Sequence, residues 1–205
     1  PEDYDFLYSD RKPPSLELNQ DIQELQEPLG NNLPDRTLIC ARFIGRSASI
    51  SELWSWVADD FSRVRLIAGE GGLGKTSLAY RFCEEIVTRN VKPFDLVLWL
   101  TAKKRQFIAS NDNFRESNHV DFESADSLYR AICLQLGCLQ DELISLDTRE
   151  LMQLALETCA TVAPFLVVDD VDSLPPDDQK SVMEFGLRAP NTVKLLLTTR
   201  VNFSY

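Results

Sequence analysis

The sequence contains little of what several common kinds of protein chemistry require. His119 is its only histidine, so a Ser-His-Asp or Cys-His catalytic site would depend on that one residue. It stands in a polar stretch, where we expect it to be solvated. The five cysteines are widely spaced and form no C-x-x-C pair, which argues against a disulfide framework and against a zinc site. We expect them to be reduced thiols, mostly buried.

Long apolar runs and an excess of basic residues are also missing. No run reaches the roughly 20 residues that span a bilayer, and the acidic, proline-containing N-terminus lacks a signal-peptide pattern. We therefore expect a cytoplasmic protein with no membrane partner. The 21 Lys and Arg residues stand against 32 Asp and Glu, for a formal net charge of -11. Because nucleic-acid backbones are bound by clustered Lys and Arg, we expect no direct nucleic-acid contact from this segment, although a basic region elsewhere in a longer protein could reverse this.

The composition that is present suits one medium-sized globular domain preceded by an arm. The 205 residues are 44% hydrophobic and 26% charged, which is ordinary for a soluble chain. Residues 1–42 are rich in proline and charge and show only a short helical pattern around residues 16–25. We interpret them as an N-terminal arm or interdomain linker, serving either as an irregular tail or as a docking segment. Residues 43–205 are the predicted folded core.

Within the core, helical and strand patterns alternate. Apolar residues at three-and-four spacing predict helices at 50–61, from Lys75 onward, at 125–136 and at 148–160. The last of these has Asp147 as N-cap and Glu150 three residues on. Short apolar runs predict strands at 65–68, 94–100, 165–168 and 193–197, and the polar stretch at 109–123 predicts a surface loop. This alternation predicts an α/β fold, with a mostly parallel sheet and helices on both faces.

A glycine-rich loop, Gly69-Glu70-Gly71-Gly72-Leu73-Gly74-Lys75-Thr76, stands between the strand at 65–68 and the following helix. In a G-x-x-x-x-G-K-[ST] loop the backbone curls so that successive N–H groups face phosphate oxygens. Lys75 would neutralise the β and γ phosphates, and the Thr76 hydroxyl would ligate Mg²⁺. A chance glycine turn with a solvated lysine is the alternative, but the flanking strand and helix favour a site for ATP with Mg²⁺ or for ADP. The predicted contacts in and beside the loop are Gly69, Gly71, Gly72, Leu73, Gly74, Lys75, Thr76 and Ser77.

Two later strands end in polar residues that complete the predicted site. Asp169 follows four apolar residues and is the candidate carboxylate for Mg²⁺, which it would hold through water. Asp170, with Lys75, is a candidate catalytic residue that would orient or deprotonate the attacking water, although two adjacent acids also suit a helix cap or a solvated turn. Thr199 and Arg200 are candidate contacts of the γ-phosphate. The alternative for Arg200 is an exposed surface arginine.

The order of these signals, preceded by Phe43-Ile44-Gly45-Arg46, resembles the nucleotide-binding core of the STAND class of signal-transduction NTPases. The resemblance covers residues 43–200 and is closest to the NB-ARC type of plant immune receptors, apoptotic scaffolds and bacterial defence proteins. It implies a three-layer P-loop NTPase fold of the ASCE/AAA+ kind, with Phe43, Ile44, Gly45 and Arg46 around the adenine. Ser47 stands where the family often has Glu. It also implies helical and winged-helix regions after this core, so we expect the chain to be part of a longer protein.

Three functions are compatible with these patterns. The resemblance implies a slowly hydrolysing switch, in which ADP holds a closed monomer and ATP gives a homo-oligomer that activates an effector domain. The trigger ligand and the effector would lie outside this segment. A turnover ATPase of the AAA+ kind that remodels DNA or protein shares the same loop and acidic strand end. In the third, the nucleotide is a structural ligand and hydrolysis has been lost.

Overall fold

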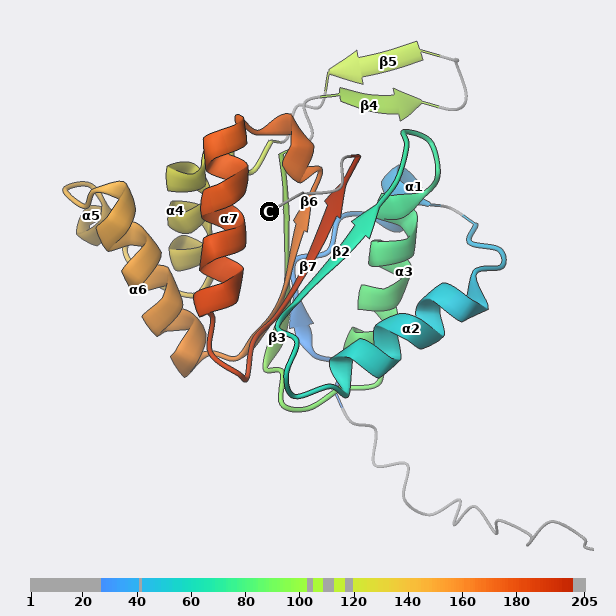
Figure 1. Cartoon of the computed structure of the whole chain (residues 1–205), viewed down its shortest axis with the longest axis horizontal. Coiled ribbons are helices and arrows are strands. Elements are labelled where there is room, and N and C mark those ends of the chain that lie inside the picture. Colours follow the sequence, from blue (N-terminus) through green and yellow to red (C-terminus); the bar gives the residue numbers. More distant parts are fainter. Residues whose placement is uncertain (1–26, 41, 103–104, 109–112, 117–119, 201–205) are drawn as a thin grey trace, which may run out of the picture.

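The structure, a computed structural model, describes residues 27–40, 42–102, 105–108, 113–116 and 120–200 (Figure 1). Two sequence-based interpretations, the helical pattern at 16–25 and the solvated His119, lie outside these residues. Among the described residues, no helix is both long enough and apolar enough to cross a membrane.

A five-stranded sheet forms the centre of the fold, and every neighbouring pair of its strands is parallel. The order across the sheet is β1 (Gly30–Asn31), β3 (Leu96–Thr101), β6 (Pro164–Asp169), β7 (Lys194–Thr199) and β2 (Val64–Ala68). The strand before the glycine-rich loop, β2, is therefore separated from the strand that ends in the two aspartates, β6, by β7 alone. All residues of β6 and β7 are buried, which explains their nearly continuous apolar sequences.

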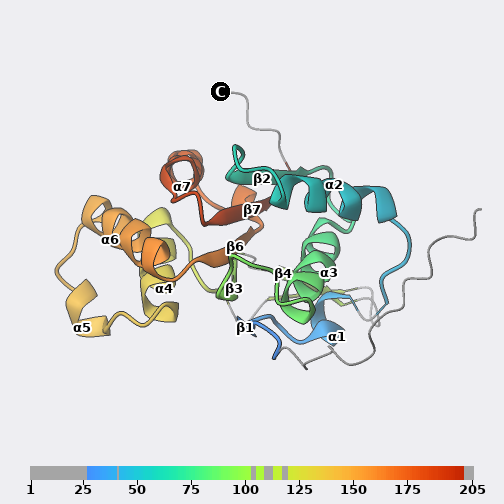
Figure 2. The ribbon, with the colours of Figure 1, turned by 90° about the horizontal axis from the view of Figure 1, so that it is seen from below.

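Helices cover both faces of the sheet, and Figure 2 shows the layers from below. Because strand side chains alternate between faces, Val97 and Trp99 pack into one hydrophobic cluster while Leu98 and Leu100 pack into another. This confirms the predicted three-layer α/β architecture. The first layer contains α1 (Arg36–Ile39), α2 (Ser47–Val57) and α3 (Lys75–Thr88), and the second contains α4 (Ala125–Gln135), α5 (Gln140–Leu143), α6 (Thr148–Thr161) and α7 (Pro176–Arg188).

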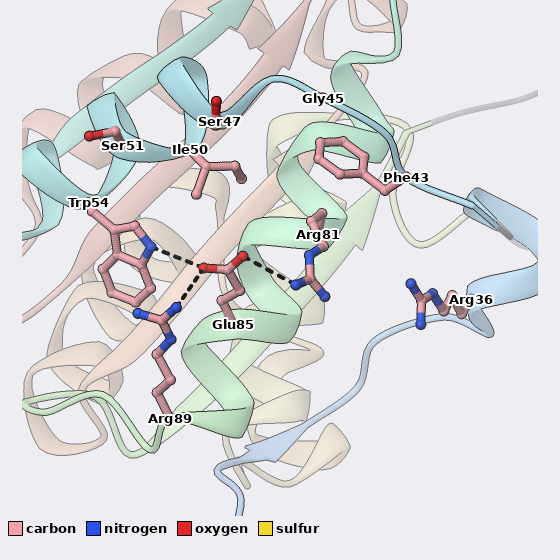
Figure 3. Close-up of a pocket in the computed structure, with 10 residues that line it drawn as sticks. All are labelled: Arg36, Phe43, Gly45, Ser47, Ile50, Ser51, Trp54, Arg81, Glu85 and Arg89. Atoms are coloured by element: carbon pink, nitrogen blue, oxygen red, sulfur yellow. Dashed lines mark hydrogen bonds and ion pairs between the residues drawn. The ribbon is translucent and has the colours of Figure 1, made fainter.

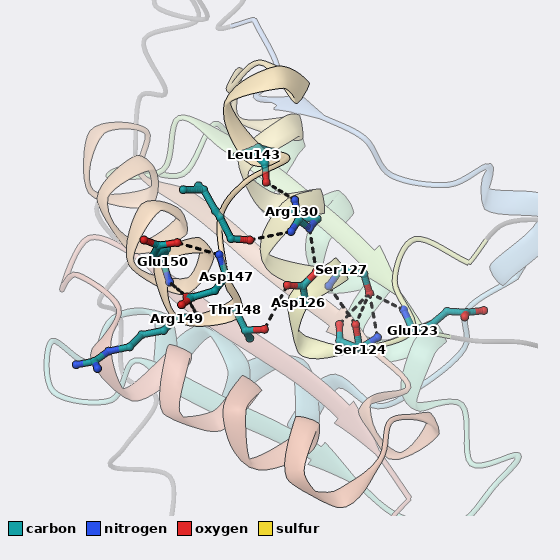
Figure 4. A network of polar contacts seen from close by, with 11 residues as sticks. Glu123, Ser124, Asp126, Ser127, Arg130, Leu143, Asp147, Thr148, Arg149 and Glu150 are labelled. Carbon is teal, nitrogen blue, oxygen red and sulfur yellow. Dashed lines mark hydrogen bonds and ion pairs between the residues drawn. The ribbon is translucent and has the colours of Figure 1, made fainter.

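A polar network joins three helices of the second layer, α4, α5 and α6 (Figure 4). Arg130 of α4 forms an ion pair with Asp126 at 2.9 Å and donates to the carbonyls of Leu143 and Leu146, at the end of α5 and in the loop after it. Asp147 accepts from the Glu150 N–H at 2.9 Å, and the Glu150 carboxylate accepts from the Asp147 N–H at 2.9 Å. The predicted capping box at the start of α6 is thus confirmed.

Part of the predicted N-terminal arm belongs to the folded domain. β1 pairs with β3, and Leu29, which is 5% exposed, donates its N–H to the Val87 carbonyl at 3.1 Å. The Asn32 amide accepts from the N–H of Trp99 at 2.6 Å and donates to its carbonyl at 2.9 Å. The boundary predicted between residues 42 and 43 is therefore too late. A two-residue edge strand held by a side-chain amide has no sequence periodicity that could have indicated it.

A second small sheet follows β3. β4 (Arg105–Ile108) and β5 (Asn113–Glu116) form an antiparallel pair, in which Phe107 is opposite Phe114. Figure 1 places this hairpin beyond the carboxyl end of the main sheet. The sequence predicted a surface loop at 109–123, so the strand at Asn113–Glu116 is a correction. Its asparagine and charged residues resemble a loop composition and hide the short strand.

Candidate nucleotide-binding site

The predicted site residues come from three strand ends, and the parallel sheet brings these ends to one edge. The loop after β2, Asp170 after β6, and Thr198 and Arg200 at the end of β7 line a cavity of about 190 Å³. The lining residues of this cavity are Gly71, Gly72, Gly74, Lys75, Thr76, Ser77, Asp170, Thr198 and Arg200.

The glycine-rich loop leads directly into α3. Gly74 is the N-cap of the helix and has φ 73°, a left-handed conformation that glycine adopts without strain. Lys75 begins the helix, and its Nζ donates to the carbonyls of Gly69 at 2.8 Å and Glu70 at 2.9 Å. The ammonium group is therefore held against the loop, which leads into the first turn of α3, where N–H groups have no carbonyl partner within the helix. This arrangement attracts anions such as phosphate.

Thr76 and Asp169 bring together oxygen atoms suited to Mg²⁺. Asp169 is 1% exposed, and its Oδ1 accepts from the Thr76 hydroxyl at 2.9 Å and from the Thr198 hydroxyl at 2.5 Å. No group of three His, Cys, Asp or Glu side chains among the described residues could hold a metal ion alone. Mg²⁺ retains water and commonly binds one or two protein oxygens together with substrate phosphates. Thr76 and Asp169 fit this mode of binding.

Asp170 and Arg200 both line the cavity and form an ion pair. Asp170 has φ 64°, and its N–H donates to the Thr198 hydroxyl at 2.9 Å. Its carboxylate accepts from the Ser173 hydroxyl at 2.6 Å and lies 3.8 Å from Arg200 Nη2. Asp170 precedes the 3-10 helix η2 (Val171–Ser173), but its side chain caps no N–H of that helix. The Asp170 side chain therefore does not serve as a helix cap, which was the alternative considered from the sequence.

The structure distinguishes the two threonines at the end of β7. Thr199 is completely buried and does not line the cavity, while its carbonyl accepts from the Gly69 N–H at 3.3 Å. Thr198 lines the cavity and bonds to both aspartates. The sequence pattern predicted Thr199 as a contact of the γ-phosphate and did not identify Thr198. The alternation of side chains along a strand could have found it, because Thr198 and Arg200 share one face.

The segment predicted to surround the adenine lies against the glycine-rich loop. Gly45 and Arg46 have φ of 76° and 59°, and Arg46 is the N-cap residue of α2. The Arg46 guanidinium donates to the Leu73 carbonyl, so it bridges this segment to the loop. Ile44 is 72% exposed and lines neither this cavity nor the one beside α2.

A second cavity of about 650 Å³ opens between α2 and α3, and Phe43 and Gly45 lie at its border (Figure 3). Glu85 stands at its centre, accepting from the Trp54 indole N–H at 3.1 Å and pairing with Arg81 at 3.4 Å and Arg89 at 3.3 Å. Of the four predicted base contacts, Phe43 and Gly45 thus line this second cavity, while Arg46 contacts Leu73 of the glycine-rich loop.

Comparison with known families identifies a match that covers most of the described core. A model described as an AAA domain matches residues 59–198, a range that contains the glycine-rich loop, both aspartates and most of β7. No curated protein sequence matches the chain.

Comparison with solved structures supports the same fold. The chain is similar to Cdc6p from Pyrobaculum aerophilum, with TM-score 0.53 and 15% identity over 82% of this chain and 43% of that one. It is similar to ORC2 from Aeropyrum pernix, solved as ADPNP-ADP complexes, with TM-score 0.53 and 15% identity over 81% and 45%. Orc1 from Aeropyrum pernix, in complex with DNA, gives TM-score 0.50 and 18% identity over 82% and 42%. The chain spans less than half the length of each of these proteins.

Proposed function

The chain belongs to the family of AAA domains, and from this premise we propose that it is the ATP-hydrolysing domain of a longer protein that remodels DNA or another protein. One observation carries the proposal. Lys75, Thr76, Asp170 and Arg200, from three separate strand ends, line one cavity, and the Asp169 carboxylate lies 2.9 Å from the Thr76 hydroxyl. This combines an anion-binding loop, oxygen ligands for Mg²⁺, an acid and an arginine in one place.

Each residue has a defined task in this proposal. The loop N–H groups and Lys75 bind the β and γ phosphates. On binding, Lys75 replaces its hydrogen bonds to the carbonyls of Gly69 and Glu70 with contacts to phosphate oxygens. Thr76 and Asp169 would hold Mg²⁺, and a bound Mg²⁺ would neutralise negative charge on the phosphates. Asp170 orients the attacking water and accepts its proton.

Recognition of the base is assigned to the segment before α2. Phe43 and Gly45 border the cavity between α2 and α3, and Arg46 links that segment to the glycine-rich loop. Phe43 and Gly45 would hold the adenine, and the glycine-rich loop with Lys75 would hold the phosphates. The partners proposed for this domain are therefore ATP, ADP and Mg²⁺. Contact with DNA is assigned to other parts of the longer protein, because the acidic chain, with net charge -11, disfavours a phosphate backbone.

A nucleotide switch of the STAND kind is the second candidate, and the position of Arg200 favours it. Its Nη2 lies 3.8 Å from Asp170 and it lines the phosphate cavity, so a γ-phosphate would change its partners while ADP would not. Such a difference between two nucleotides is what a switch requires. In this function, ATP would favour a homo-oligomer and hydrolysis would be slow.

Phosphate release with ATP and Mg²⁺ tests the proposal, using wild type, Asp170→Asn and the surface control Asp177→Asn. We expect sustained turnover by wild type and by the control, with a loss of at least about 100-fold for Asp170→Asn, as is typical when a general base is removed. ATP affinity should stay near the wild-type value in all three. A switch would instead purify with bound ADP and turn over slowly. Wild-type protein that binds ATP without hydrolysing it would overturn the enzymatic proposal and leave a structural ligand.

A further inference from the structure

Asp172, which has no role in the mechanism above, holds the backbone and the side chain of Arg200 at once. It lies in η2, and its side chain is 12% exposed. Its Oδ1 accepts from the Arg200 backbone N–H at 2.7 Å, and its Oδ2 lies 3.4 Å from Arg200 Nε. Both carboxylate oxygens therefore contact the same residue, one at the point where the chain leaves β7 and one along the guanidinium.

The guanidinium is shared between two carboxylates that contact different nitrogens. Asp172 faces Nε, and Asp170 faces Nη2 at the longer distance of 3.8 Å. Nη2 is thus the more weakly paired nitrogen. The Arg200 side chain is 58% exposed, so without Asp172 it would populate many rotamers, at a considerable entropy cost to any fixed contact.

The surroundings set this contact apart from ordinary surface pairs. Asp177 and Lys180 of α7 also form an ion pair, at 3.4 Å, but their side chains are 97% and 78% exposed. Pairs of that kind contribute little because water screens both charges. The Asp172 carboxylate is largely buried and accepts from a backbone N–H as well, and a charged group of this kind holds its partner more firmly.

We propose that Asp172 is a positioning residue that holds Arg200 between Asp170 and the phosphate cavity, an inference that rests on the proposed nucleotide function. With the γ-phosphate absent, Nη2 stays on Asp170. A γ-phosphate attracts the Nη end of the guanidinium while Asp172 retains Nε and the backbone N–H. Asp170 then loses its cationic partner and is free to orient water only when ATP is bound.

The test compares affinities for ADPNP and ADP, measured by calorimetry with Mg²⁺, in wild type, Asp172→Ala, Asp172→Asn, Arg200→Ala and the double variant Asp172→Ala/Arg200→Ala. We expect Asp172→Ala and Arg200→Ala each to weaken ADPNP by about 3- to 10-fold, the scale of one partly exposed charged contact. ADP affinity should change by less than about 2-fold. The double variant should lose no more than Arg200→Ala alone, because Asp172 acts only through Arg200.

The matched control is Asp177→Asn, which removes one exposed carboxylate from the same region and should leave both affinities unchanged. If Asp172→Ala does not fold, Asp172→Asn decides, because it keeps the size and an acceptor oxygen while losing the charge; a reduced ADPNP preference is expected there too. Equal losses for both nucleotides, additive losses in the double variant, or an unchanged preference would overturn the inference.

Adding Lys75→Ala to the same titrations tests the proposed function separately. If wild type binds neither nucleotide, or if Lys75→Ala binds both as wild type does, the proposed function fails and this inference fails with it. If Lys75→Ala loses binding while the Asp172 variants keep the wild-type preference for ADPNP over ADP, only the positioning role of Asp172 is wrong.

Discussion

The Thr76 hydroxyl donates to the Asp169 carboxylate at 2.9 Å across 93 residues of sequence. This contact joins the first turn of α3 to the end of β6, and it fixes the two side chains that we assign to Mg²⁺. Because Asp169 is almost fully buried and also accepts from Thr198 at 2.5 Å, its position is set before any ligand enters.

Asp169→Asn should remove most of the effect of Mg²⁺ on ATP binding. The amide has nearly the same shape but no charge, and Mg²⁺ prefers anionic oxygen. Calorimetric titrations with ATP, with Mg²⁺ and with EDTA, should show a clear gain from Mg²⁺ in wild type and in Asp177→Asn, but only a small one in Asp169→Asn. An undiminished gain in Asp169→Asn would argue against its role as the metal-side carboxylate.

Gly186→Ala should destabilise the domain although alanine favours helices. Gly186 lies in α7 where the helix packs on the sheet, and a Cβ there would come within 2.5 Å of Leu195 Cδ2 and 2.7 Å of Val64 Cγ2. Such overpacking typically costs about 1–3 kcal/mol, which exceeds the roughly 1 kcal/mol gained in helix propensity. Urea unfolding measures the change, with the exposed α7 position Lys180→Ala as the control. A more stable Gly186→Ala variant would contradict the packing.

Thiol alkylation in the native protein should distinguish two groups of cysteines. Cys83, Cys133 and Cys159 are buried, while Cys40 and Cys138 are partly exposed. Burial raises the pKa of Cys133 and of Cys159 to about 12, and burial together with the charge of Asp169 raises the pKa of Cys83. At pH 8 the thiolate, which is the reactive form, is scarce at these sites. Mass spectrometry after brief iodoacetamide treatment should find Cys40 and Cys138 modified first; equal rates at all five would contradict the buried positions.

The same thiols predict a loss of stability at alkaline pH. Cys133 and Cys159 have an ordinary pKa of 9.0, raised to about 12 in the folded chain. A pKa that is higher in the folded state contributes stability below pH 9, and this contribution is lost as pH rises from 9 toward 12. The free energy of unfolding in urea should therefore fall between pH 8 and pH 10, and it should fall less steeply in Cys133→Ala. Parallel pH profiles for the two proteins would contradict this linkage.

The sequence predicted those elements whose residue pattern extends over the whole strand, helix or loop. The four longer strands of the main sheet are apolar runs because helices cover both faces, and α6 carries its capping box in Asp147 and Glu150. The loop from Gly69 to Thr76 needs special backbone angles, for example φ 73° at Gly74, so its glycines identify it without the fold.

The features that the sequence did not predict depend on contacts between residues that are far apart in the chain. β1 has only two residues and is held by the Asn32 amide on Trp99, so no periodicity reveals it. The choice between Thr198 and Thr199 requires the register of β7, since a shift of one residue exchanges the two faces. In the sequence, Asp172 is a further acidic residue after Asp169 and Asp170, with no feature that indicates a role. Its contact with Arg200 becomes visible only in the folded structure.

The most direct test of the account is calorimetric binding of ATP with Mg²⁺ to wild type, Lys75→Ala and the control Lys180→Ala, with thermal unfolding measured for each. Among the described residues, the Lys75 side chain donates hydrogen bonds only to the loop carbonyls of Gly69 and Glu70. Its loss should therefore leave the fold intact. We predict that wild type and Lys180→Ala bind ATP alike and that Lys75→Ala weakens binding by at least about 30-fold, or ~2 kcal/mol. Undiminished ATP binding by a folded Lys75→Ala protein would contradict a nucleotide site at this loop.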